Sequence, residues 1–200
     1  MRQPSFALTA ILTLALAIGA TTAIFSVVNA VIIKPLPFHD PDRIVAVTNL
    51  STRTGLPNLQ VSVPDFHDWE AQSRSFESMA LFNGGETSVT LSASADYASV
   101  YRVTPRFFDV LGAPAARGRL LSAEELRSGG ADAIVITDAF WRRQFKGEDR
   151  AVGSTVKFAD QIFTIVGVLA PAIRYPARAD IYVSSAIAPE TTSRSGTTIA

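Results

Sequence analysis

The sequence predicts an α+β protein that is anchored by one N-terminal transmembrane helix and continues as a mixed α+β domain. Three observations lead to this fold class. The run Phe6–Ile33 has 28 residues and no charged side chain. The chain that follows is long enough to bury a core of its own. Its short strand-like and helix-like segments do not alternate regularly, which favours a mixed domain over a doubly wound sheet.

The uncharged run is predicted to cross a membrane as a single helix. At about 1.5 Å of rise per residue it would reach roughly 42 Å, against roughly 30 Å for a hydrocarbon core. Pro35 and Pro37 follow it and would stop the helix. A cleavable signal peptide, cut after the small residues near Gly19, is the alternative. The apolar run continues to Ile33 beyond that point and only Arg2 precedes it, which favours the anchor.

Ala15, Gly19 and Ala23 are expected to form a helix-packing face on this segment. They are spaced four residues apart, so they stack on one side of a helix and would let a second helix approach closely in lipid. The alternative is that small residues are simply common in apolar helices. No ionisable group lies inside the run, so no ion or proton path is predicted.

The remaining chain is predicted to form short strands and short helices. Strands are expected at residues 44–48, 60–63, 78–82, 87–91, 98–103, 133–137, 153–158, 161–169 and 180–183. Helices are expected at residues 64–73, 104–111, 123–127 and 139–145.

Turn and cap residues mark several of these boundaries. Asn83-Gly84-Gly85 predicts a turn between two strands, and Ala159-Asp160 predicts the turn of a hairpin. Thr104 is the expected N-cap of the helix that Gly112 ends, and Asp138 is the expected N-cap of the last helix.

The composition excludes several function classes. Lys plus Arg and Asp plus Glu number 18 each, so no basic surplus indicates a nucleic-acid partner. There is no cysteine, which excludes thiolate metal sites and disulfides. His39 and His67 lack metal-ligand spacing. The sequence therefore predicts no catalytic residue, no cofactor, no metal site and no enzyme activity.

Two kinds of charge cluster have more than one interpretation. Asp65, Asp68 and Glu70 crowd one short helix and would suit a cation, but acids near a helix N-terminus are explained by the helix dipole. The arginines at 117 and 119 and at 142 and 143 form small basic clusters, which are more often solvated faces than recognition sites.

Five segments carry a resemblance to a known family. LTLALAIGATTAIFSVVNAVIIKPLPFHDPDRIV, residues 12–45, resembles the first transmembrane helix and exit connector of FtsX-like, MacB-type ABC transporter permeases. Asn commonly stands in that family where this chain has Thr21. Residues 61–80, 103–121, 134–145 and 163–183 resemble successive blocks of the MacB-like periplasmic core domain.

The resemblance implies a domain organisation and a location. Residues 1–37 would be the transmembrane helix and connector, 38–188 the periplasmic core domain, and 189–200 a polar loop or truncated end. The chain would span the inner (plasma) membrane once, with its main domain outside the cytoplasm. Such permeases have three further helices after the core domain, so the chain is expected to be an N-terminal fragment.

The resemblance also implies a function and partners. The chain would be a permease subunit whose periplasmic domain couples ATPase-driven motion to export or to mechanotransmission, while a separate subunit or domain hydrolyses ATP. Its partners would be membrane lipid, further permease helices or a second permease subunit, an ABC ATPase and a periplasmic adaptor. A single-pass anchored binding or sensor module is the alternative.

Overall fold

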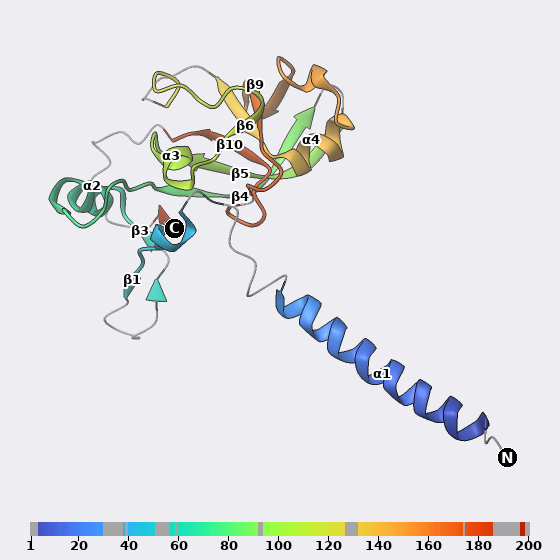
Figure 1. Ribbon diagram of the computed structural model, residues 1–200. Coiled ribbons are helices and arrows are strands. Elements are labelled where there is room, and N and C mark those ends of the chain that lie inside the picture. Colours follow the sequence, from blue (N-terminus) through green and yellow to red (C-terminus); the bar gives the residue numbers. More distant parts are fainter. Residues whose placement is uncertain are drawn as a thin grey trace. The chain divides into compact units, whose positions relative to one another are not determined.

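The computed structural model describes residues 4–29, 38, 40–50, 57–58, 60–91, 94–126, 132–173, 175–185 and 197–198. The chain divides into two compact units, residues 1–37 and 38–200, and each is described here by itself. Figure 1 shows the helix of the first unit and the strands and short helices of the second.

Among its described residues, the first unit contains one helix, α1, which covers Pro4–Val28. Its hydroxyl groups bond back to carbonyl oxygens one turn earlier: Thr13 to Thr9 at 2.8 Å and Thr21 to Ala17 at 2.9 Å. These side chains are therefore satisfied within the helix itself. Within the described part of the chain, no helix combines the length and the hydropathy required of a membrane span.

The second unit is built on a mixed sheet with the strand order β6-β9-β7-β10-β5-β4-β8. Its strands are β4 (Phe82–Leu91), β5 (Ser94–Val103), β6 (Ala115–Gly118), β7 (Ala133–Ile136), β8 (Thr155–Phe158), β9 (Gln161–Leu169) and β10 (Ile181–Ser184). The β5–β10 and β7–β9 pairs are parallel and the other pairs are antiparallel. The predicted mixed α+β class is confirmed.

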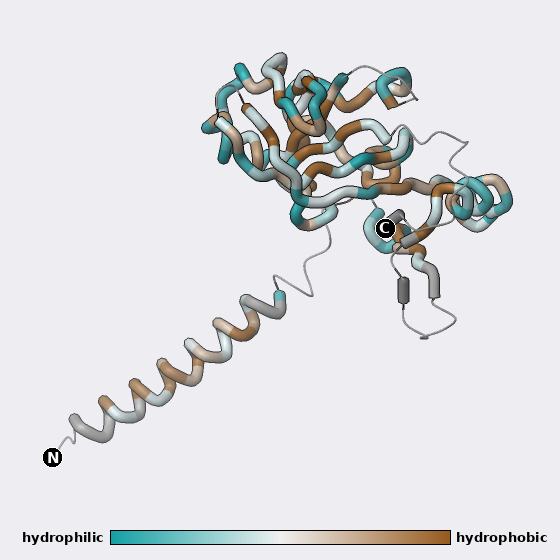
Figure 2. The backbone as a smooth tube through the Cα atoms, turned by 180° about the vertical axis from the view of Figure 1, so that it is seen from behind, coloured by the Kyte–Doolittle hydropathy of each residue, from teal (hydrophilic) through white to brown (hydrophobic). Residues whose placement is uncertain are grey.

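Strand β8 closes this sheet into a ring. It pairs with β9 along its whole length and with β4 at Thr90 and Leu91. The pairing therefore runs β4-β5-β10-β7-β9-β8 and returns to β4, while β6 attaches to β9 outside the ring. Figure 2 shows hydrophobic residues concentrated along the central strands.

The largest apolar cluster lines one face of every ring strand. Its residues follow the two-residue side-chain period of a strand. They are Val89 and Leu91, Ala98 and Val100, Ile134 and Ile136, Val156 and Phe158, Phe163, Ile165 and Val168, and Ile181 and Val183. On β9 the step from Ile165 to Val168 coincides with a register shift in its pairing with β7. The irregular pairing thus keeps apolar side chains on the same face.

Helix α4 (Asp138–Phe145) adds Phe140 and Trp141 to this cluster. The predicted N-cap Asp138 is wrong by one position. Thr137 is the N-cap, and its hydroxyl accepts a bond from the Phe140 N–H at 3.3 Å. Asp138 is instead the first helical residue and pairs with Arg142 at 2.8 Å, a spacing of one helical turn.

Helix α3 (Phe107–Leu111) packs on the face of the sheet opposite to the first cluster. Phe107, Phe108 and Leu111 join a second cluster that includes Val103 and Tyr182. The helix ends at Gly112 as predicted, in the left-handed conformation with φ 58°.

The start of α3 differs from the prediction. The hydroxyl of Thr104 accepts a bond from the Leu81 N–H at 2.9 Å, so it does not cap the helix. The helix begins three residues later than Thr104 for this reason, with Arg106 at the N-cap position.

Helix α2 (Val63–Gln72) begins at the cap Ser62, whose hydroxyl accepts from the Asp65 N–H at 3.2 Å. Phe66 anchors it in a third cluster with Val61 and Leu81. The smaller elements are the 3₁₀ turns η2 (Pro41–Arg43) and η3 (Asp149–Ala151), and the strands β1 (Asn49–Leu50), β2 (Pro57–Asn58), β3 (Gln60–Val61) and β11 (Thr197–Thr198). Strand β1 pairs with β2, and β3 pairs with β11.

Several predicted elements are wrong. Asn83-Gly84-Gly85 is not a turn but lies inside β4, paired with residues 100–102. Residues 78–81 precede that strand instead of forming one, and residues 44–48 contain no assigned strand. Residues 123–126 form a turn instead of a helix, while residues 127–131 and 186–196 lie outside the described residues.

Gly84 is required by a close approach of two strands. A Cβ at this position would lie 2.1 Å from the carbonyl oxygen of Val100, whereas a Cβ at Gly85 would meet nothing within 4 Å. Substitutions at Gly84 and Gly85 can therefore be compared as a test position and its matched control.

We expect Gly84→Ala to lower the free energy of unfolding by about 2 kcal/mol or more, because β4 and β5 must separate to admit the methyl group. Gly85→Ala should change it by less than about 0.5 kcal/mol. Urea unfolding of both variants, followed by circular dichroism, checks this. Equal effects would contradict the register of the β4–β5 hairpin.

A bidentate ion pair between Arg119 and Glu125 stabilises the turn after β6. The Arg119 guanidinium donates to the two Glu125 oxygens at 2.6 and 2.7 Å. The Ser122 N–H donates to the same carboxylate at 2.7 Å. These bonds, led by the one from Arg119, lower the pKa of Glu125 from 4.5 to about 2. The stabilisation is present above pH 4.5 and is lost as the pH falls toward 2.

Glu125→Gln should therefore flatten the loss of stability between pH 4.5 and 2. The difference is about 1–2 kcal/mol, reduced from the full pKa shift because Arg119 is half exposed. Urea midpoints across this range measure it. The exposed neighbour Glu124, changed to Gln, is the control; identical pH profiles for the two variants would contradict the role of the ion pair.

Candidate docking groove

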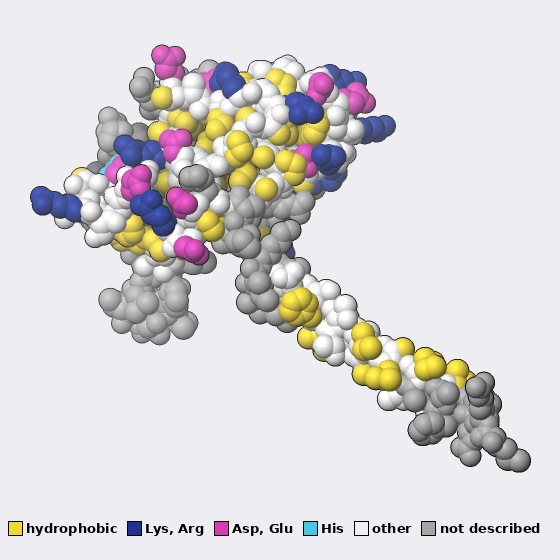
Figure 3. Space-filling model, viewed as in Figure 1, with side chains coloured by type: hydrophobic (Ala, Val, Ile, Leu, Met, Phe, Trp, Pro, Cys, Tyr) yellow, Lys and Arg dark blue, Asp and Glu magenta, His cyan; other side chains and the backbone are white. Residues whose placement is uncertain are grey.

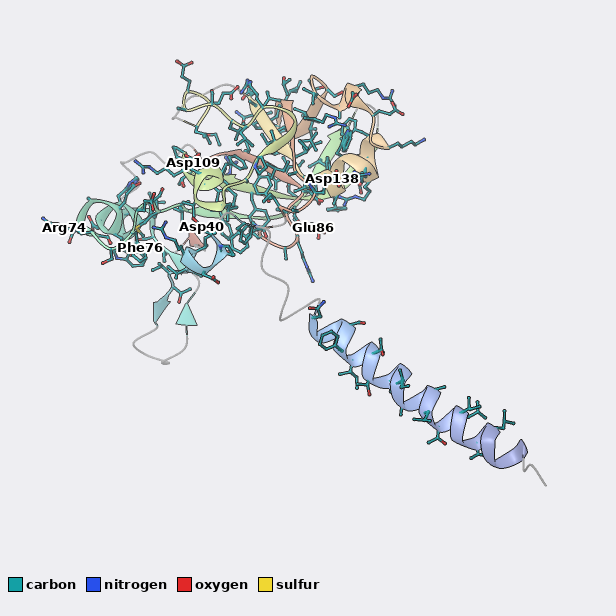
Figure 4. All side chains as sticks on the ribbon, in the orientation of Figure 1. Asp40, Arg74, Phe76, Glu86, Asp109 and Asp138 are labelled. Carbon is teal, nitrogen blue, oxygen red and sulfur yellow. The ribbon has the colours of Figure 1, made fainter. Side chains whose placement is uncertain are left out.

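A groove of about 610 Å³ lies between three segments of the second unit: residues 40–47, the loop 75–80 and the start of α3. A smaller hollow of about 210 Å³ adjoins it and shares Phe76, Glu77, Ser78, Met79 and Arg106 with it. Figure 4 places Asp40, Phe76 and Asp109 on the same side of the domain. Figure 3 shows acidic, basic and apolar side chains mixed over this side.

Helix α3 provides one wall because it is amphipathic over a single turn. Phe107, Phe108 and Leu111 are buried in the second cluster. Arg106, Asp109 and Val110 line the groove, at the i, i+3 and i+4 spacing of one helix face. The loop 75–80 is held between α2 and β4, and Phe76 on it is 40% exposed.

The opposite wall is the run Ile44–Thr48. Ile44 has extended backbone angles, φ −89° and ψ 125°. The backbone groups of Val45–Thr48 make no hydrogen bond to any residue that the structure describes. The predicted strand is thus a β-branched segment without a partner strand among the described residues.

The charged groups of the groove are only partly paired. Arg43 and Glu77 form an exposed ion pair at 2.8 Å. Among the described residues, Arg106 and Asp109 have no ion-pair partner, and the buried Ser78 hydroxyl oxygen has no hydrogen-bond partner. Exposed charged groups of this kind are suited to contact with a polar ligand, and they are not an acid, base and nucleophile in contact.

Asp65 and Glu70, two acids of the charge cluster on α2, contact neighbouring residues one helical turn away. The Asp65 N–H donates to the Ser62 hydroxyl at 3.2 Å, and the Asp65 carboxylate accepts from that hydroxyl at 2.6 Å. His67 lies 3.7 Å from Glu70. The part of the chain that the structure describes contains no group of three side chains able to hold a metal ion. His39 lies outside the described residues.

The basic clusters also support the fold. Arg117 and Arg142 both lie over the Trp141 ring, each 5.6 Å from its centroid. Arg143 pairs with Asp180 at 3.0 Å and so joins α4 to the residue that directly precedes β10. Arginines of this kind stabilise through contact area as well as charge.

The predicted packing residues Ala15, Gly19 and Ala23 lie on α1, outside the second unit and its groove. All three are exposed, and a Cβ at Gly19 would meet nothing within 4 Å. Their packing role therefore stays a prediction. Sequence reasoning missed the groove, because its lining comes from three segments that are distant in the sequence.

Groove residues should contribute little to folding. We expect Phe76→Ala to cost less than about 1 kcal/mol and Arg106→Gln less than about 0.5 kcal/mol, because both side chains face solvent. The buried Phe66, changed to Ala, should cost about 3–5 kcal/mol. Urea unfolding of the three variants measures these changes in the free energy of unfolding. A loss at Arg106 as large as that at Phe66 would show that the groove is part of the core.

Comparisons with known proteins agree with the fold described above. The sequence model of the MacB-like periplasmic core domain matches residues 7–200. The periplasmic region of MacB from Actinobacillus actinomycetemcomitans is similar with a TM-score of 0.55 and 18% identity, over 76% of this chain and 70% of that chain. The extracellular domain of the noncanonic ABC-type transporter YknZ from Gram-positive bacteria gives a TM-score of 0.55 and 15% identity, over 70% and 71%.

No curated protein matches the chain. At these identities the two solved structures support the fold, and the match of the family model over nearly the whole chain supports the membership. The chain belongs to the family of MacB-like periplasmic core domains, the extracytoplasmic domains of ABC transporter permeases.

Proposed function

We propose that the chain is a membrane-anchored permease part of an ABC-type transporter, in which the extracytoplasmic domain couples ATPase-driven motion to export or to mechanotransmission. One observation carries the proposal. The family match begins at residue 7 and runs without interruption through the uncharged helix into the domain. The range that the family model matches therefore includes the helix together with the domain.

The proposed anchor is the uncharged run Phe6–Ile33, of which α1 covers the larger part. A helix satisfies its own backbone groups, which lipid cannot do. The back-bonded hydroxyls of Thr13, Thr21 and Ser26 remove a further polar cost. The chain would cross the inner (plasma) membrane once at residues 1–37, and residues 38–188 would form the periplasmic core domain ahead of a polar end at 189–200.

The proposed partners follow from what the sequence lacks and what the family supplies. The sequence has no G-x-x-x-x-G-K-[ST] loop to hold ATP phosphates. An ABC ATPase would supply hydrolysis, and further permease helices or a second permease subunit would complete the transmembrane part. A periplasmic adaptor would bind the domain.

A single-pass binding or sensor module is the second candidate. The groove supports it, because its unpaired groups offer a binding surface that does not depend on an ATPase. Purification from native membranes separates the two candidates. An ABC ATPase that copurifies in stoichiometric amount supports the permease, whereas a chain that purifies without any ATPase supports the binding module.

The membrane topology is testable because the chain contains no cysteine. We expect Ser88→Cys, on the exposed part of β4, to react with a membrane-impermeant maleimide on intact spheroplasts. Gln3→Cys should react only after the membrane is permeabilised, because the anchor separates the two positions. Labelling of both cysteines in intact cells would contradict a span between them.

The packing face is tested by one matched pair on α1. Gly19→Leu should disrupt association with a neighbouring helix, because a branched side chain prevents close backbone approach. Ala17→Leu, about 160° around the helix from Gly19, should leave it intact. Blue native electrophoresis of membrane extracts measures the size of the complex. Equal migration of the two variants would remove Ala15, Gly19 and Ala23 from the interface.

A further inference from the structure

We propose that Ile44–Thr48 is an open strand, and that the groove beside it receives an extended segment of a partner polypeptide carrying one carboxylate side chain. The segment would pair with the open strand, and its carboxylate would bind Arg106. This proposal goes beyond the permease function and holds for an anchored binding module as well.

The backbone of the run is the first argument. The sequence Ile-Val-Ala-Val-Thr has four β-branched residues in five, which is a strong preference for a strand. Yet Val45–Thr48 make no backbone hydrogen bond with the described residues, although β1 continues directly from them at Asn49. A row of unpaired N–H and C=O groups is a template for an added strand.

The apolar side chains beside the run are the second argument. Val45 is 57% exposed and Phe76 is 40% exposed, and Met79 and Val110 also line the groove. An added strand points every second side chain to the same face. Alternating apolar residues of a partner would therefore cover this surface while the backbone pairs with the open strand.

The charges determine the polar feature of the partner. Arg106 lines both hollows and has no ion-pair partner among the described residues, whereas Arg43 is already paired with Glu77. Arg106 therefore suits a carboxylate. Asp40 and Asp109 line the same groove and would repel a second one.

The probe is a labelled peptide, acetyl-Val-Thr-Glu-Thr-Val-Thr-amide, whose two Val residues and Glu point to the same face of a strand. It is titrated by fluorescence anisotropy against the full chain in detergent micelles. One control peptide is N-methylated at alternate residues, which removes the hydrogen bonds of one strand edge. A second replaces Glu by Gln. Arg106→Gln is the groove variant, and Arg102→Gln, an exposed arginine on β5, is the matched control.

We expect the probe to bind and the N-methylated peptide to lose binding. Replacement of Glu by Gln in the peptide should weaken binding about tenfold, and so should Arg106→Gln in the chain. The two changes together should weaken it no further than either alone, because they remove the same contact. Arg102→Gln should leave the affinity unchanged, and circular dichroism should show that both variants are folded.

Three results would overturn the proposal. The first is no binding at millimolar peptide, which would contradict an open strand. The second is equal binding of the N-methylated peptide. This result would contradict strand pairing as the mode of binding, and it does not depend on whether a variant folds. The third is equal weakening by Arg102→Gln, which would reduce the role of Arg106 to general attraction. None of these results bears on membrane topology or on copurification of an ATPase.

Discussion

The closure of the ring through β8 is the interaction on which the rest of the domain depends. This strand pairs with β9 through the Ala159-Asp160 turn and with β4 at its other edge. The turn residues have φ of 48° and 60°, the left-handed conformation that such a tight hairpin requires. Because every ring strand then has two neighbours, the apolar residues on one face of the strands become a sealed core.

The other face of the ring positions the groove. The second cluster buries Phe107, Phe108 and Leu111 of α3, and this orientation places Arg106 and Asp109 on the groove side. Ile44–Thr48 lies in the same unit but is not a strand of the ring. The groove therefore has one wall fixed by the core and one wall whose backbone, at Val45–Thr48, makes no hydrogen bond with the described residues. That combination suits a site that accepts a strand and less one that performs chemistry.

The sequence predicts the local hairpin and helices well because their signals are local. Alternating apolar residues and the Ala159-Asp160 turn determine β8 and β9, and Gly112 ends α3. Interactions between residues that are distant in the sequence are harder to predict from it. Gly84 resembles a turn residue, but it is required by the carbonyl of Val100 on the neighbouring strand. Thr104 has the sequence of a cap, but it binds Leu81 instead. The groove combines three distant segments, so no single motif reports it.

The closed ring and its unpaired neighbour are tested most directly by residue-resolved hydrogen exchange of the full chain under native conditions. Amides of β8, such as Val156, should exchange with the same opening free energy as those of β10, such as Tyr182, because a closed ring opens as a unit. Amides of Val45–Thr48 should exchange near the rate of an unstructured chain. Early opening of β8 alone, or strong protection of Val45–Thr48, would contradict this arrangement.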